Sequence, residues 1–209
     1  KKFLDADSMV EAVSSTGAFI NIRLKPQYLF TDALRVAREK KAIIGKVDRI
    51  MVEYVSPNTN KPLHLGHVRN GVIGSAIANI LESVGHDVIR SILINDKGVH
   101  ICKSMFAYMN WGDGSTPESL GQKGDHFVGH WYVEYAKAAK ENPELEHEIN
   151  KMLLFWENGD QEIIDLWEKM NDWVYEGFEQ TYKLFGFRFD KTYYESQLYL
   201  EGKEIVLEG

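Results

Sequence analysis

The sequence is poor in cysteine, since Cys102 is the only one among 209 residues. A single thiol excludes a disulfide framework within the chain and is typical of a reducing compartment, so we expect a cytoplasmic protein. No apolar run reaches the roughly 18 residues that a membrane helix needs. The N-terminal residues also lack the hydrophobic segment of a secretory signal. We therefore expect no membrane partner.

Positive charge is scarce as well. The chain has 24 Lys and Arg residues against 31 Asp and Glu residues, which gives a net charge of −7. Nucleic-acid binding depends on phosphate contacts from Lys and Arg, so this surface is a poor candidate for holding nucleic acid unaided. The hydrophobic share of 44% and the charged share of 26% are ordinary for a globular protein.

The hydrophobic patterns in the first half predict an alternation of strands and helices. Residues 18–24 and 27–41 favour a strand and a helix, respectively. Residues 49–55 then predict a buried strand, 64–84 a helix buried on much of its circumference, and 87–94 another strand. A strand, a helix and a strand in this order form a βαβ unit with parallel strands. Ligands of such α/β sheets bind outside the carboxyl ends of the strands, where the turn after residue 55 lies.

The second half is predicted to be mainly helical. Residues 97–110 favour a helix, residues 111–124 a glycine-rich loop, and residues 126–186 mainly helices that break near Asn142 and Asn158. We interpret about 105–186 as a helical insertion in the α/β domain. Residues 187–199 return to a strand-like alternation.

The segment that predicts chemistry is His64-Leu65-Gly66-His67, at the expected start of the buried helix. A helix N-terminus offers free backbone N–H groups and a positive potential, which suit a phosphate. Gly66 leaves room where a nucleotide must approach the backbone. Histidines three residues apart project from one face of the first turn, so both imidazoles can donate to one phosphate group.

Two other interpretations of the histidine pair are a purely structural role and a metal site. A metal site lacks an obvious third ligand, because His86 and His100 are isolated and Cys102 has no second thiol beside it. We therefore expect no bound structural metal.

Three stretches resemble one known family. Residues 52–58 and 64–70 closely resemble the first signature of the class I aminoacyl-tRNA synthetases in its arginyl form, with a Ser-Pro-Asn turn, a lysine three residues before the first histidine and Arg-Asn after the second. Residues 19–24 look like the end of that family's N-terminal additional domain. Phe189-Asp190 followed by Glu195-Ser196 looks like its arginine-reading strand.

The resemblance implies a Rossmann-like parallel sheet with a helical insertion. It divides the chain into the end of the N-terminal domain with a linker (1–45) and part of the catalytic domain (46–209). It also implies ATP-dependent activation of arginine to arginyl-adenylate and transfer to tRNA(Arg). ATP would enter as its Mg²⁺ complex, and the enzyme would be a monomer.

The family's site residues transfer where the motif matches. His64 and His67 would bind the ATP phosphates and act in catalysis, Gly66 would leave room for the adenosine, Asn58 would hold the α-amino end of arginine, and Glu195 would pair with its guanidinium. A fork of guanidinium N–H groups suits a carboxylate. An exposed acid at a strand end remains the alternative for Glu195.

Lys61 is placed to reach an ATP phosphate, and a solvated turn lysine is the alternative. The family's second signature, a Lys-Met-Ser-Lys-type loop, is absent from the sequence. Lys169-Met170-Asn171-Asp172 mimics its start but falls in a helical pattern. We therefore expect a fragment that is inactive alone. Two other functions stay open, namely a nucleotidylyltransferase with the same His-x-Gly-His motif and a non-catalytic ATP-binding module of the same fold.

Overall fold

The computed structural model describes residues 9–39 and 45–208. Contacts between Cα atoms divide these residues into two compact units. One unit holds the described residues up to 48 together with 80–87, and the other holds 49–79 and 88–208. The last two residues of the predicted helix 27–41 lie outside the described residues.

The first unit begins with a hairpin of β1 (Val10–Thr16) and β2 (Phe19–Leu24), which pair antiparallel. Gly17, with φ of 59°, makes the turn between them, a backbone conformation that glycine adopts at little cost. Helix α1 (Pro26–Glu39) follows, and a proline is tolerated in its first turn. The structure confirms the strand predicted at 18–24 and adds β1, which the sequence pattern did not indicate.

The second unit is built on a parallel sheet in the order β3-β4-β5. Its strands are β3 (Arg49–Glu53), β4 (Asp87–Ile94) and β5 (Lys191–Tyr194), and α2 (Leu65–Ser83) connects the first two. Strand β5 runs parallel to β4, with Ser91 opposite Lys191 and Ile94 opposite Tyr194. The predicted α/β fold with a parallel sheet is thus confirmed.

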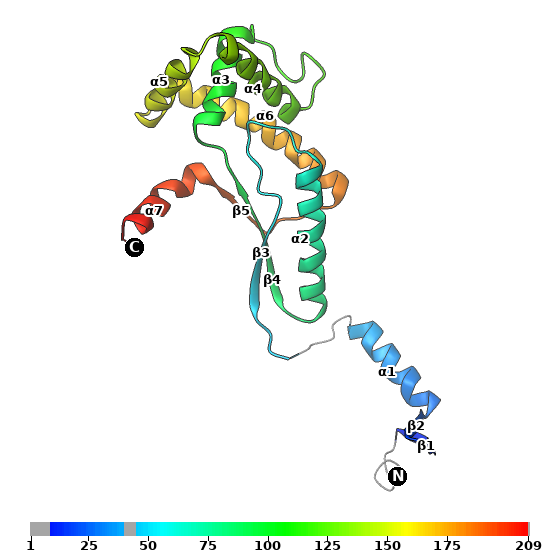
Figure 1. Cartoon of the computed structure of the whole chain (residues 1–209). Helices are drawn as coiled ribbons and strands as arrows, with labels where there is room; N and C mark the ends of the chain where they lie inside the picture. Colours follow the sequence, from blue (N-terminus) through cyan, green and yellow to red (C-terminus); the bar gives the residue numbers. More distant parts are fainter. Residues whose placement is uncertain (1–8, 40–44, 209) are drawn as a thin grey trace. The chain divides into compact units, whose positions relative to one another are not determined.

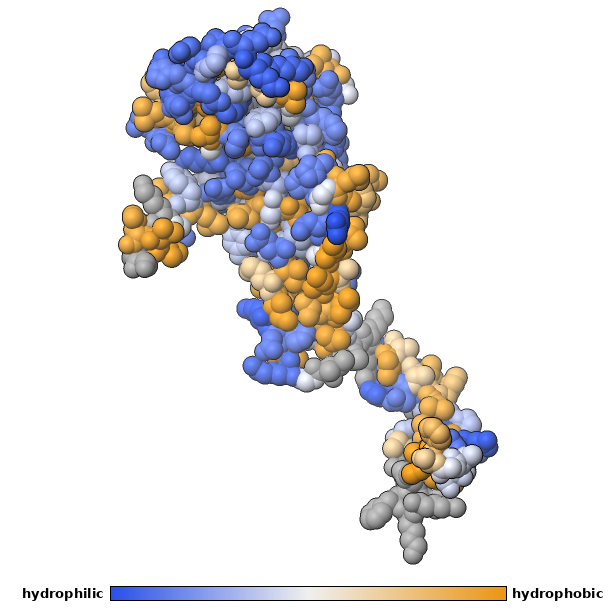
Figure 2. Space-filling model, in the orientation of Figure 1, coloured by the Kyte–Doolittle hydropathy of each residue, from blue (hydrophilic) through white to orange (hydrophobic). Residues whose placement is uncertain are grey.

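Helix α2 is less buried than its two apolar stripes predicted. Only Gly71, Gly74 and Ala78 are buried along it, and of these Gly71 faces Phe187 and Gly74 faces Tyr54. Val72, Ile73 and Ile77 are about half exposed, and Figure 2 shows an apolar surface where α2 lies. The prediction of burial on much of the circumference was wrong for this chain, because its sheet covers only one face of the helix.

Four helices form a single body at the carboxyl ends of the strands (Figure 1). They are α3 (Val99–Trp111), α4 (Gly124–Glu141), α5 (Leu145–Glu157) and α6 (Gln161–Phe185). Edge-to-face rings fill the centre, where Tyr108, Phe127 and Trp173 meet at centroid distances of 5.3 to 5.9 Å. The predicted helical insertion is confirmed, and Lys169-Met170 lies inside α6 rather than in a loop.

The end of the chain differs from its prediction. The strand-like alternation at 187–199 yields only the four residues of β5, and helix α7 (Glu195–Glu208) begins immediately afterwards. Asp96 accepts a hydrogen bond from the backbone N–H of Ser196 at 2.8 Å. A carboxylate at a helix N-terminus stabilises the first turn, and this tertiary contact is invisible in the local pattern.

Candidate active site

His64 is the residue that caps α2. Its backbone carbonyl accepts from the N–H groups of His67 at 2.9 Å and Val68 at 3.1 Å, so the helical bonds start at His64. Its own Nδ1 accepts from the backbone N–H of Gly66 at 3.0 Å. A side-chain acceptor on one of the first free N–H groups is the defining contact of an N-cap.

His67 completes the arrangement in the opposite direction. Its Nδ1 accepts from the backbone N–H of His64 at 3.2 Å, and the two rings lie 4.0 Å apart between centroids. Burial, and then the neighbouring His64, lower the pKa of His67 below its usual value. A neutral imidazole whose Nδ1 accepts a hydrogen bond carries its proton on Nε2. Nε2–H of His67 is therefore a donor that the cap leaves free. In His64 the Gly66 N–H occupies Nδ1, which leaves Nε2 as the nitrogen that can donate to a ligand.

Gly66 has a structural reason beyond the one inferred from the sequence. A Cβ at this position would lie 2.8 Å from Cε1 and 2.9 Å from Nδ1 of His64. Such distances are shorter than van der Waals contact, so any side chain would displace the imidazole. The glycine thus permits the His64 ring to fold back over the first turn of the helix.

The turn between β3 and the motif has an unusual backbone. Val55 and Ser56 have φ values of 70° and 38°, a region that β-branched residues avoid. Asn70 Oδ1 accepts from the Val55 N–H at 2.6 Å, and Ser56 Oγ accepts from the N–H of Leu93 at 3.2 Å. Strain of this kind costs roughly 1–3 kcal/mol and persists where the surroundings hold it. Here it turns the chain toward Asn58.

Asn58 and Glu195 both lie at the carboxyl edge of the sheet. Asn58 forms a parallel bridge with Asn95, the residue after β4, and Glu195 follows Tyr194, the last residue of β5. Asn58 is exposed and Glu195 is half-buried. Since Ile94 pairs with Tyr194, the two residues stand on either side of the end of β4. Two strand spacings separate them, roughly 10 Å.

Lys61 is directed toward the helical insertion. Its Nζ lies 5.3 Å from the ring centroid of Tyr132 on α4, within reach of a cation–π interaction. The same helix supports the loop, because Asp125 Oδ2 accepts from the N–H of Leu63 at 3.3 Å. Asp125 is fully buried and forms an ion pair with Lys123 at 2.9 Å. The insertion therefore fixes the residues just before His64.

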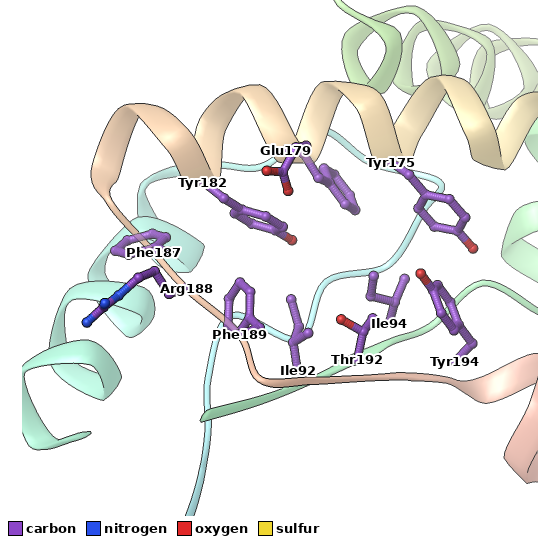
Figure 3. Close-up of a pocket in the computed structure, with 11 residues that line it drawn as sticks. Ile92, Ile94, Tyr175, Glu179, Tyr182, Phe187, Arg188, Phe189, Thr192 and Tyr194 are labelled. Atoms are coloured by element: carbon purple, nitrogen blue, oxygen red, sulfur yellow. The ribbon is translucent and has the colours of Figure 1, made fainter. Parts of the chain in front are cut away.

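A cavity of about 390 Å³ lies between α6 and the face of β4 and β5 (Figure 3). Its walls are mostly aromatic, with the rings of Tyr175 and Tyr194 at one end and Phe187 at the other. The hydroxyl of Tyr182 is buried there without a hydrogen-bond partner among the described residues. Burial and nearby carboxylates raise the pKa of Tyr182 and Tyr175, so both remain protonated phenols.

The structure adds three residues that the sequence did not single out. Asn70 holds the strained turn and Asp125 holds the loop before the motif. Asp96 links the C-terminal end of β4 to the first turn of α7. Asp96 is the second residue after the buried strand β4, in the region where ligand-site residues gather in α/β sheets, so a signal existed for it. Asp125 gives no such signal, because it depends on how α4 packs.

No group of three or more His, Cys, Asp or Glu side chains within residues 9–39 and 45–208 is arranged to hold a metal ion. No helix in that part of the chain has both the length and the apolar content to cross a membrane.

Comparisons with known proteins identify the family of the chain. A family model described as the catalytic domain of class I (R) tRNA synthetases matches residues 30–206. An arginine–tRNA ligase of Porphyromonas gingivalis is 44% identical over 225 residues, covering 97% of this chain and 38% of that protein. One of Bacteroides thetaiotaomicron is 52% identical over 177 residues, covering 77% of this chain and 30% of that protein.

Among solved structures, Thermus thermophilus arginyl-tRNA synthetase superposes with a TM-score of 0.67 at 30% identity. The match covers 93% of this chain and 32% of that one. The chain thus spans between 30% and 38% of the length of these relatives. A family match over most of its length and a shared fold lead to one conclusion, that the chain belongs to the arginyl family of class I tRNA synthetase catalytic domains.

Proposed function

We propose that this chain is the part of an arginine–tRNA ligase that binds ATP phosphates and arginine. The observation that carries the proposal is the pair of imidazoles at the start of α2, whose Nδ1 atoms both accept from backbone N–H groups. Their Nε2–H groups are fixed before any ligand arrives. Donors fixed in advance against developing charge are an effective means of lowering a barrier.

In the proposed first step, an oxygen of the arginine carboxylate attacks the α-phosphorus of ATP. The bond from that phosphorus to the bridging oxygen breaks, and pyrophosphate leaves with Mg²⁺. The Nε2–H groups of His64 and His67 donate to phosphate oxygens on which charge accumulates. In the second step, a terminal ribose hydroxyl of tRNA(Arg) attacks the acyl carbon and AMP leaves.

The carboxyl edge of the sheet is where we place arginine. Asn58 would accept from the α-ammonium group, and Glu195 would accept from the guanidinium at the other end. Their separation of about two strand spacings, roughly 10 Å, suits a long amino acid held at both ends. Lys61 would assist at a phosphate if its ammonium left the Tyr132 ring.

Two features of the sequence indicate that other parts of the enzyme neutralise the leaving pyrophosphate and hold the tRNA. This sequence lacks a Lys-Met-Ser-Lys-type loop to neutralise the leaving pyrophosphate. Its net charge of −7 is unfavourable for holding tRNA unaided. We therefore expect the 209-residue chain to fold yet to form little adenylate by itself.

The test is arginine-dependent exchange of pyrophosphate into ATP, measured with the full-length protein and with the 209-residue chain, each with and without tRNA. The proposal expects exchange by the full-length protein that depends on arginine. The alternative, a nucleotidylyltransferase, would instead exchange with a phosphorylated alcohol or a nucleotide and would ignore arginine. The names of the relatives support the ligase over that alternative.

A further inference from the structure

Asp96 is a buried carboxylate that joins two elements of the sheet edge. Only 2% of its surface is exposed. Oδ1 accepts from the backbone N–H of Ser196 at 2.8 Å, and Oδ2 accepts from Ser196 Oγ at 2.7 Å. The Tyr175 hydroxyl donates to the same Oδ2 at 3.2 Å. The first turn of α7 is thereby attached to the residue that follows Asn95.

The backbone around Asp96 is held as firmly as its side chain. Its carbonyl accepts from Trp167 Nε1 at 2.6 Å, which ties it to α6. The preceding residue, Asn95, donates its N–H to the Pro57 carbonyl and accepts from the Thr59 N–H, both at 3.0 Å. Residues 95 and 96 therefore connect the loop that carries Asn58 to the helix that begins with Glu195.

We propose that Asp96 is a positioning residue that sets the separation between Asn58 and Glu195, and with it the length of amino acid that the site accepts. The inference rests on the proposed function, because it takes these two residues as the ends of the arginine site. Asn58 is fixed through Asn95, and Glu195 is fixed through the adjacent Ser196. Asp96 is the covalent neighbour of the first anchor and the hydrogen-bond partner of the second.

The role requires an acid and not merely a polar residue. All three groups that face the side chain are donors, and an ionised carboxylate offers only acceptors. An asparagine would keep one acceptor oxygen and present its NH₂ group to Ser196 or Tyr175, whose hydroxyl would have to change from donor to acceptor. The carboxylate of Asp96 also lies at the N-terminus of α7, where the helix dipole favours an anion. Burial and Asp96 both raise the pKa of Tyr175, so this hydroxyl remains a donor.

A cavity of about 290 Å³ beside Asp96 provides a matched control. Asp172 on α6 lines the same cavity, is exposed, and makes no hydrogen bond with Ser196. Asp172→Asn and Asp96→Asn remove the same charge at neighbouring places. Only Asp96→Asn replaces an oxygen that accepts a hydrogen bond from the first turn of α7.

The experiment measures the KM for arginine and for ATP by pyrophosphate exchange in the full-length protein with tRNA. Asp96→Asn should lower kcat/KM for arginine by about 10-fold to 100-fold, mainly through a higher arginine KM, since a misplacement of 1 Å costs up to about 100-fold in rate. The ATP KM should stay near the wild-type value, and Asp172→Asn should change neither. If Asp96→Asn does not fold, Ser196→Ala is measured in its place. It should raise the arginine KM by a smaller factor, and Ser196→Thr should return the KM to the wild-type value.

Selectivity gives a readout that a purely structural role would not move. The ratio of kcat/KM for arginine to that for the analogue one methylene longer should fall in Asp96→Asn and stay constant in Asp172→Asn. Equal rises in the two KM values, or an unchanged ratio, would overturn the positioning role. Absence of arginine-dependent exchange in the wild type would overturn the proposed function instead, and Glu195→Gln, which should raise the arginine KM, tests the anchor separately.

Discussion

The backbone N–H of Gly66 donates to Nδ1 of His64 at 3.0 Å, so the first histidine of the motif caps the helix that the motif begins. His67 Nδ1 in turn accepts a hydrogen bond from the His64 N–H at 3.2 Å. Reciprocal contacts of this kind form a capping box, usually made from Ser or Thr and Glu. Here two imidazoles form it, and each ring has a second nitrogen left over for a ligand.

The two nitrogens of His64 can be separated by mutation. His64→Asn places an amide oxygen near the Nδ1 position and removes Nε2, so the cap survives and the donor is lost. His64→Gln places its amide nitrogen near the Nε2 position and loses the cap. We expect His64→Asn to lower the exchange rate by roughly 10²–10³ with little change in stability. His64→Gln should lose less rate but about 0.5–2 kcal/mol of unfolding free energy.

Urea unfolding and pyrophosphate exchange on the same preparations of full-length protein measure both quantities. A parallel loss of rate and stability in the two variants would show that one function of the ring depends on the other. A wild-type exchange rate in His64→Asn would show that Nε2 of His64 does not donate to the ATP phosphates.

Gly66→Ala should separate activity from stability in the same way. The added Cβ lies within 2.9 Å of His64 ring atoms and forces the imidazole aside. Alanine favours a helix over glycine by up to about 1 kcal/mol, and loss of the His64 cap costs about 0.5–2 kcal/mol, so the two effects largely offset each other. The free energy of unfolding should therefore change little while the exchange rate falls. In a His64→Ala background the ring is absent, and Gly66→Ala should then have no further effect on the rate. An additive loss would place the effect elsewhere.

The lowered pKa of His67 gives stability a pH dependence of definite sign. The unfolded chain takes up a proton on this imidazole near its usual pKa of about 6.5, where the folded protein does not. Stability is therefore complete above that value and falls as the pH decreases below it. His67→Asn keeps an acceptor near the Nδ1 position without titrating. Urea unfolding between about pH 5 and pH 8 should show a smaller acid loss in this variant than in the wild type. An equal loss would contradict the assignment.

The fold was predictable where local pattern and tertiary packing agree. Strand β4 was predicted at its observed bounds, because residues 87–94 form a run rich in β-formers between a glycine turn and a polar residue. Helix α2 was predicted within one residue at each end. Its burial was predicted wrongly, because apolar periodicity shows which faces a helix could bury and not which neighbours this chain provides.

The site was predictable only in part. The motif placed the two histidines at a helix N-terminus, but no pattern shows that His64 Nδ1 accepts from the Gly66 N–H and His67 Nδ1 from the His64 N–H. Glu195 was expected within a strand and begins a helix, because Asp96 caps it from about 100 residues away in the sequence. Asp125 and Gly129 depend on the packing of α4 against the loop, which no local signal encodes.

The last prediction concerns that packing. Gly129 faces Pro62, and a Cβ on it would lie 2.5 Å from the proline Cδ. Gly129 is within α4, where alanine alone would favour the helix by up to about 1 kcal/mol. A loss of stability in Gly129→Ala would therefore report the clash, for which overpacking typically costs about 1–3 kcal/mol. Since Pro62 stands two residues before His64, the exchange rate should fall as well.

Gly202 on α7 is the matched control. Among the described residues, no atom beyond its chain neighbours and the backbone of its own helix lies within 4 Å of a Cβ built there, so Gly202→Ala adds the same methyl group without a collision. It should leave the exchange rate unchanged and raise stability slightly. Urea unfolding and pyrophosphate exchange of both variants in the full-length protein compare the two positions. Wild-type stability and rate in Gly129→Ala would mean that the loop moves freely, and the insertion would then not support His64 and His67.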